Sequence, residues 1–122
     1  MTERRRYERI KIQLTGSIKD REIERGLTRP SVAILDLSLG GAYCEIGRYL
    51  PPLTKVMLSL NFPGDAEEEA AVCRGVVVRV EPEEEEAERE NYKVGILFTE
   101  ISREDRDKLK HFLGRQLEKG SG

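Results

Sequence analysis

Short apolar runs with a period of two recur along the sequence, and they restrict the fold more than any other feature. Residues 10–18 carry an aliphatic side chain or glycine at every second position, and residues 56–62 alternate in the same way. Such alternation is typical of half-buried strands. Further apolar runs rich in β-branched residues follow between turn signals, at residues 31–35, 42–46, 70–80 and 92–98. Six runs without a helix between them indicate an all-β chain, folded as an antiparallel barrel or sandwich.

The end of the chain has a different period. Ser102 stands three residues before Asp105, which resembles the capping box of a helix N-terminus. The apolar residues that follow are spaced for one helical face, at Leu109, Phe112, Leu113 and Leu117. We therefore expect one amphipathic helix that packs on the barrel, with His111 outside its apolar stripe and exposed.

Length and composition limit the classes of protein that this chain can belong to. The 122 residues suit a single domain. The apolar runs stay far below the ~20 residues of a membrane span, and no signal-peptide core opens the sequence, so a cytoplasmic location is expected. Cys44 and Cys73 lie in apolar runs, where a free cysteine behaves as a small buried side chain.

The sequence contains few residues that could form a catalytic or metal centre. No cysteine and histidine spacing fits a metal site, and His111 is the single histidine. Ser38 lacks the context of a nucleophile elbow, and no phosphate-binding glycine loop is present. The chain is therefore not expected to be an enzyme, and neither a catalytic residue, a metal nor a cofactor is predicted.

Charge is unevenly distributed, although the formal net charge is only −2. Residues 81–90 hold seven Glu and one Arg, which indicates a solvated loop. Residues 1–11 hold five basic and two acidic side chains and begin with an aperiodic polar stretch. The planar guanidinium of arginine binds phosphate or the O6 and N7 atoms of guanine through paired hydrogen bonds. The N-terminal segment is thus expected to be a flexible arm that orders on an anionic ligand.

A second polar feature interrupts the apolar runs at Asp36-Leu37-Ser38-Leu39-Gly40-Gly41. Asp36 is expected to end a strand, where its carboxylate could accept hydrogen bonds from the N1 and N2 edge of guanine. The Ser38 hydroxyl could bind a phosphate or the backbone. The two glycines permit a positive φ and a close approach of ligand to backbone. Alternatively, Asp36 and Ser38 serve only to form a turn between strands.

Together the two polar features resemble the PilZ domain family. Arg5-Arg6-Tyr7-Glu8-Arg9 matches the family pattern R-x-x-x-R, and residues 36–41 match D-x-S-x-x-G. The run Tyr92-Lys93-Val94-Gly95-Ile96-Leu97-Phe98 is similar to the glycine-containing last strand of the family. The resemblance implies a six-stranded antiparallel β-barrel with a C-terminal helix over residues 12–118, preceded by a flexible arm over residues 1–11.

The resemblance also implies a function, namely binding of the bacterial second messenger cyclic di-GMP. Arg5 and Arg9 would hold phosphates and guanine, and Arg4 would favour uptake of a stacked ligand pair. Asp36 and Ser38 would bind a guanine edge. The implied ligand-binding residues are Arg4, Arg5, Arg9, Asp36, Ser38, Gly40 and Gly41. Binding would be relayed by a conformational change to a protein partner in motility, biofilm formation or secretion.

Two other functions stay open at this point. The chain could be a PilZ-like protein-interaction module that does not bind cyclic di-GMP. It could also be a small barrel that binds nucleic acid through the basic arm. The second is less favoured, and no nucleic acid is expected as a partner, because Tyr7 is the one aromatic residue near the arm and tryptophan is absent.

Overall fold

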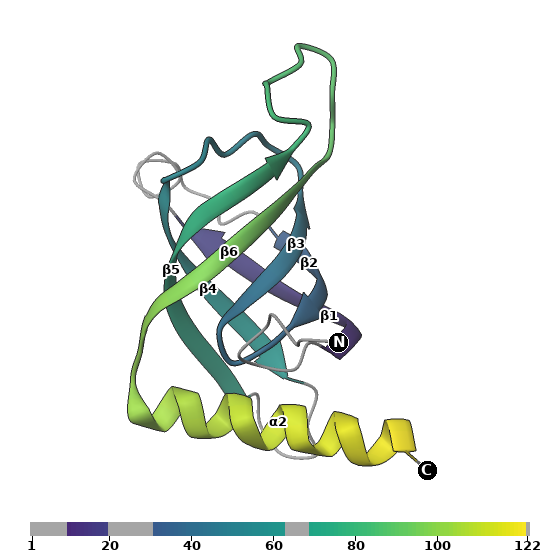
Figure 1. Cartoon of the computed structure of the whole chain (residues 1–122), viewed down its shortest axis with the longest axis vertical. Coiled ribbons are helices and arrows are strands. Elements are labelled where there is room, and N and C mark those ends of the chain that lie inside the picture. Colours follow the sequence, from purple (N-terminus) through teal and green to yellow (C-terminus); the bar gives the residue numbers. More distant parts are fainter. Residues whose placement is uncertain (1–9, 20–30, 63–68, 122) are drawn as a thin grey trace, which may run out of the picture.

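The computed structural model describes residues 10–19, 31–62 and 69–121, and Figure 1 shows its strands with a helix across one end. The strands are β1 (Ile10–Lys19), β2 (Ser31–Leu37), β3 (Gly41–Ile46), β4 (Lys55–Phe62), β5 (Glu69–Glu81) and β6 (Tyr92–Ile101), and the helix is α2 (Arg103–Ser121). The order β1-β2-β3-β6-β5-β4 closes into a barrel because β1 pairs with both β2 and β4. Every pairing is antiparallel. The predicted six-stranded antiparallel barrel with a C-terminal helix is confirmed.

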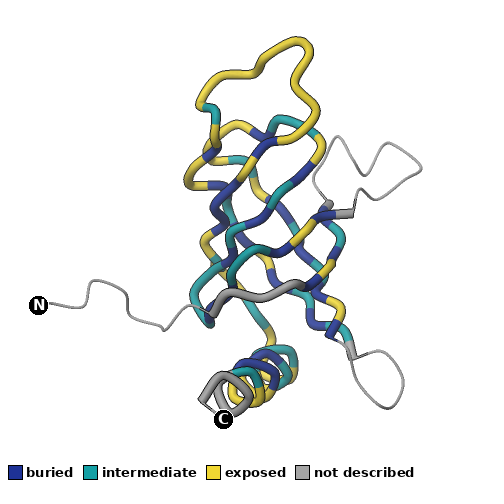
Figure 2. Tube along the Cα trace, turned by 90° about the vertical axis from the view of Figure 1, so that its right-hand side faces the viewer, coloured by how far each residue is buried: buried dark blue, intermediate teal, exposed yellow. Residues whose placement is uncertain are grey.

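The side chains at every second position of each strand fill the inside of the barrel. Along β4, Val56, Leu58, Leu60 and Phe62 are buried, while the residues between them are exposed or half-buried. Figure 2 shows the same alternation of buried and more exposed positions on the other strands. Each fully buried aliphatic side chain stabilises the fold by about 1.5–3 kcal/mol. The core therefore lies within one closed sheet, and outward-facing side chains are available for other roles.

Both cysteines belong to this core. Cys44 and Cys73 are free and fully buried, as their apolar surroundings in the sequence predicted. Burial, reinforced by the negative charge of Asp36, raises the pKa of the Cys44 thiol from its usual 9.0 to about 12. Burial also raises the pKa of the Cys73 thiol to about 12. Both thiols are thus held in their neutral form.

The second strand corrects one expectation. Asp36 was expected to end this strand, but β2 continues through it to Leu37. A bulge lies at this point. Ile34 pairs with Cys44, and Asp36, two residues further along β2, pairs with Tyr43, which is adjacent to Cys44 in β3. The bulge inserts one residue, so that Ile34 and Leu37 can both be buried. Asp36 stays in the ladder without entering the core.

The helix closes one end of the barrel (Figure 1). The Asp105 backbone N–H donates to Ser102 Oγ over 3.1 Å, which confirms Ser102 as the N-cap. Leu109, Phe112 and Leu113 are buried, and the ring of Phe112 stacks on that of Phe62 with centroids 4.6 Å apart. His111 is exposed, as predicted. No helix in the described part of the chain has the length and apolar character needed to cross a membrane.

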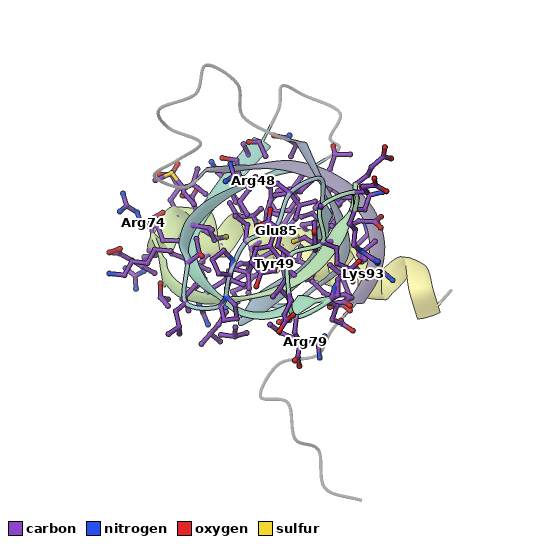
Figure 3. All side chains as sticks on the ribbon, turned by 90° about the horizontal axis from the view of Figure 1, so that it is seen from above. Arg48, Tyr49, Arg74, Arg79, Glu85 and Lys93 are labelled. Atoms are coloured by element: carbon purple, nitrogen blue, oxygen red, sulfur yellow. The ribbon has the colours of Figure 1, made fainter. Side chains whose placement is uncertain are left out.

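The Glu-rich loop projects from the opposite end of the barrel, where residues 83–90 are exposed (Figure 2). The solvated loop predicted for this run is confirmed. Two tyrosines anchor its base: Tyr49 Oη donates to the Glu83 carbonyl over 2.7 Å, and Tyr92 Oη exchanges hydrogen bonds with the Glu86 backbone at 2.9 and 3.0 Å. Viewed along the barrel axis, Tyr49 lies over this end (Figure 3). The loop is therefore fixed at its base and directed away from the helix end.

Some sequence expectations lie outside the described residues. One is the flexible arm before Ile10. The sequence also predicts a polar hairpin tip at residues 20–30 and a turn at Pro63-Gly64-Asp65, and both lie outside the described residues too. β1 begins at Ile10, two residues before the expected start of the barrel at residue 12.

Candidate functional site

An open groove of about 700 Å³ lies on the outer wall of the barrel. Its volume falls in the range of small-molecule sites, about 300–1,000 Å³. One side is the β2–β3 turn, the floor is formed by β5 and β6, and Arg106 of α2 also lines the groove. The described lining residues are Ser38, Leu39, Gly40, Gly41, Val78, Arg79, Gly95, Ile96, Leu97, Phe98, Thr99, Glu100, Ile101 and Arg106.

The turn beside the groove is held by the side chain of Ser38, which is only 6% exposed. Its hydroxyl accepts a hydrogen bond from the Gly40 N–H at 3.1 Å and donates one to the Gly41 carbonyl at 3.4 Å. The Ser38 N–H also donates to the Gly41 carbonyl, at 2.9 Å. Of the two roles considered for this hydroxyl, the structure shows the backbone one. A ligand in the groove would meet a turn that Ser38 has already fixed.

Gly41 is required by the barrel itself. A Cβ atom at this position would collide with the Ile96 carbonyl of β6, so the two strands can approach only if residue 41 is glycine. The Phe98 N–H of β6 donates to the Gly40 carbonyl at 2.9 Å and ties the turn to the groove floor. The positive φ that the two glycines permit is not used, since none of the described glycines has one. Close packing of backbones, rather than an unusual conformation, explains the glycine.

Asp36 lies beside the groove and is not among its lining residues. It is half-buried and pairs with Tyr43, so both side chains stand on the outer face of the sheet. The structure therefore brings Ser38, Gly40 and Gly41 together in the groove wall, with Asp36 next to them. The other predicted site residues, Arg4, Arg5 and Arg9, precede the described residues.

The floor of the groove is apolar, which the sequence analysis missed. Val78 and Leu97 are 53% and 50% exposed, unusual values for aliphatic residues in strands of this barrel. Leu97 pairs with Gly41, whose missing side chain leaves Leu97 uncovered on that side. At Val78 the register of β5 against β6 shifts between Val77 and Arg79. This bulge turns consecutive residues of β5 outward, and such bulges often re-aim side chains at binding sites.

A polar cluster stands at the edge of this floor. The Arg79 guanidinium lies over the Tyr43 ring, 5.1 Å from its centroid, and its Nε is 3.7 Å from Glu81 Oε1. Tyr43 Oη donates a short hydrogen bond to Glu81, and this bond, more than burial, raises the pKa of Tyr43 above its usual 10.0. Gly95 separates Tyr43 from Arg79 in the sheet, and without a side chain it leaves room for their contact. Arg79 points away from the barrel axis (Figure 3).

The sequence did contain a signal for Arg79. It interrupts a run of valines, Val76-Val77-Val78-Arg79-Val80, and thereby breaks the apolar character of a strand. Arg106, the second arginine of the groove, comes from the first turns of α2 and had no comparable signal, because polar residues are normal there. The site thus combines an apolar floor with two arginines, Arg79 from β5 and Arg106 from α2.

Solved structures that share this fold include one from Bacillus subtilis and one from Escherichia coli. The inhibitor of motility from Bacillus subtilis, MotI/DgrA, matches with a TM-score of 0.72 and 21% identity, over 97% of this chain and 53% of that chain. This chain therefore spans about half the length of that protein. The PilZ domain of YcgR from Escherichia coli, solved with c-di-GMP, matches with a TM-score of 0.67 and 15% identity over 98% of both chains. At these identities the likeness shows the fold alone.

No curated protein matches the sequence. The sequence profile of the PilZ domain, however, matches residues 3–115, which is nearly the whole chain. It includes the N-terminal arginine segment, the β2–β3 turn and all six strands. The chain therefore belongs to the PilZ domain family.

Proposed function

We propose that this PilZ domain binds cyclic di-GMP in the groove beside the β2–β3 turn. The observation that carries the proposal is the position of the turn, since Ser38, Gly40 and Gly41 of the D-x-S-x-x-G segment form one side of the groove. Cyclic di-GMP has two flat guanines and two phosphates. The exposed faces of Val78 and Leu97 suit a base, and guanidinium groups at the groove suit phosphate.

The topology supports a part for the N-terminal arginines. Ile10, the first residue of β1, pairs with Leu37, the residue before Ser38. Ile10, the residue that follows the arginine segment in the sequence, therefore lies next to the turn. In the proposal Arg5 and Arg9 hold the phosphates and contact guanine, and Arg4 favours uptake of a stacked pair. Asp36, on the outer face beside the turn, accepts hydrogen bonds from a guanine edge.

The proposed role is that of a cytoplasmic bacterial signalling module without catalytic activity. MotI/DgrA is described as an inhibitor of motility, and the YcgR PilZ domain was solved with c-di-GMP. By this likeness the ligand-bound domain would change its surface and act on a protein partner, with motility machinery the first candidate and biofilm or secretion machinery the others.

Titration calorimetry with cyclic di-GMP tests the proposal. Wild-type protein should saturate with micromolar or tighter affinity, about −8 kcal/mol or better. Arg5→Ala, Arg9→Ala and Asp36→Ala should each weaken binding by about tenfold or more, the usual effect of losing a hydrogen bond to a charged group. Arg115→Ala removes the same charge from an exposed helix position outside the groove and should bind like wild type.

The titration also separates the alternatives. Absence of saturable heat with the wild-type protein would contradict the proposal and favour a protein-interaction module that needs no ligand. Salt-dependent retardation of single-stranded RNA or DNA, without binding of cyclic di-GMP, would instead favour nucleic-acid binding through the basic arm.

A further inference from the structure

The groove is also lined by positive charge that lies outside both sequence motifs. Among the described lining residues three are charged, namely Arg79, Arg106 and Glu100. Arg79 is already engaged by the Tyr43 ring and Glu81. Arg106, in contrast, has no such partner for its guanidinium in the described part of the chain.

Arg106 is half-buried at the start of α2, where its backbone N–H donates to the Ser102 carbonyl at 2.8 Å. Its guanidinium forms no hydrogen bond or ion pair with another residue of the described part of the chain. Two acidic side chains of the same helical turn lie near Lys108 instead, because Lys108 Nζ is 4.0 Å from Glu104 Oε1 and 3.8 Å from Asp105 Oδ1. Glu100, the acidic residue of the groove lining, forms no ion pair within the described part of the chain. The fold thus places an arginine in the groove without giving its charge a partner there.

Local electrostatics make this placement unfavourable without a ligand. The N-terminal turn of a helix carries partial positive charge, so a cation in it is not stabilised by the helix dipole. Partial burial adds a desolvation cost for the guanidinium. An anion in the groove would relieve both effects, because it would accept paired hydrogen bonds from the guanidinium and face the positive end of α2.

We propose that Arg106 is a further ligand-binding residue, and that its guanidinium binds a phosphate of the cyclic dinucleotide. This inference rests on the proposed function. The ligand then spans the groove from the Ser38 turn to α2, with a base on Val78 and Leu97 between them. Since α2 closes one end of the barrel, a phosphate on Arg106 places the ligand in direct contact with the helix.

A matched pair of variants tests the contact. Arg103 and Arg106 lie in the same helical turn and carry the same charge, but Arg103 is exposed and does not line the groove. In calorimetry with cyclic di-GMP, Arg106→Ala should weaken binding at least tenfold and Arg103→Ala less than twofold. Arg106→Lys should fall between Arg106→Ala and wild type, because lysine keeps the charge but loses the planar fork.

The outcomes separate this inference from the proposed function. Wild-type protein that binds, with Arg106→Ala within twofold of it, would overturn the inference and leave the function standing. Equal losses for the Arg103 and Arg106 variants would overturn it too, since they would indicate a general effect of charge on α2. A wild-type protein that shows no binding would remove both.

Backbone amide hydrogen exchange supplies a readout that a purely structural role would not change. Cyclic di-GMP should slow exchange in residues 103–109 of the wild-type protein and much less in saturated Arg106→Ala. Unchanged exchange in α2 of wild-type protein at saturation would overturn the contact. If Arg106→Ala fails to fold, Arg106→Lys and Arg106→Gln provide the same comparison, with far-ultraviolet circular dichroism to establish that α2 is intact.

Discussion

Two neighbouring residues of β5, Val77 and Val78, show how differently the two faces of this barrel are used. Val77 is fully buried in the core, whereas Val78 is 53% exposed in the groove. The same side chain thus stabilises the fold at one position and forms a binding surface at the next. Ordinary alternation along the strand separates the two, because successive side chains point to opposite faces. The bulge between Val77 and Arg79 then keeps Arg79 on the same outer face as Val78. A second bulge, before Asp36 in β2, sets the pairing of Asp36 with Tyr43.

The comparison predicts opposite outcomes for two identical changes. Val77→Ala should lower the free energy of unfolding by about 2–3 kcal/mol, because it removes buried methyl groups and leaves a cavity. Val78→Ala should change stability by less than about 0.5 kcal/mol but weaken binding of cyclic di-GMP. Urea denaturation and calorimetry measure the two effects. Equal destabilisation by both changes would show that the outer position also belongs to the core.

Gly41 both packs against the backbone of β6 and lines the outer groove. Gly41→Ala should destabilise the protein by about 1–3 kcal/mol, because the added Cβ would collide with the Ile96 carbonyl and force β3 and β6 apart. Urea denaturation measures the loss. If Gly41→Ala instead kept full stability and lost only ligand affinity, the glycine would serve the ligand directly, as the sequence first indicated.

The buried thiols make the stability of the barrel core depend on pH. Burial holds the pKa of both Cys44 and Cys73 at about 12, above the usual 9.0 of the unfolded chain. The unfolded state loses its thiol protons first, so their stabilising effect is complete below about pH 9 and declines as the pH rises toward 12.

The expected size of this effect is small. When the pH is raised from about 8 to about 9.5, each thiol should lower the free energy of unfolding by at most about 1 kcal/mol. Urea denaturation of wild type and of a Cys44→Ala, Cys73→Ala double variant at both pH values gives the difference, which cancels other titrating groups. An identical pH dependence in the two proteins would mean that the thiols are accessible to water.

The fold could be predicted well from the sequence because its main determinant is local. Each strand or helix buries one face, and this alone determines where its apolar residues stand. Buried residues therefore alternate along β4 and follow helical spacing at Leu109, Phe112 and Leu113. The end of β2 could not be predicted, since a bulge changes the parity of a strand by one residue and depends on pairing with β3.

The candidate site was predictable only in part. Its motif residues could be named, and Ser38, Gly40 and Gly41 do meet at one groove. Arg106 could not be found in this way, because it is separated from the turn by more than 60 residues and only barrel closure and the packing of α2 bring the two together. The role of Gly41 was also hidden, because it depends on the backbone of a strand far along the chain, β6.

Backbone amide chemical shifts, followed during titration with cyclic di-GMP, show whether the ligand occupies the outer groove. The largest changes should fall at residues 38–41, 78–79, 95–101 and 106, with little change in the Glu-rich loop at residues 83–90. Changes confined to other surfaces, or no changes at millimolar ligand, would contradict binding in the groove.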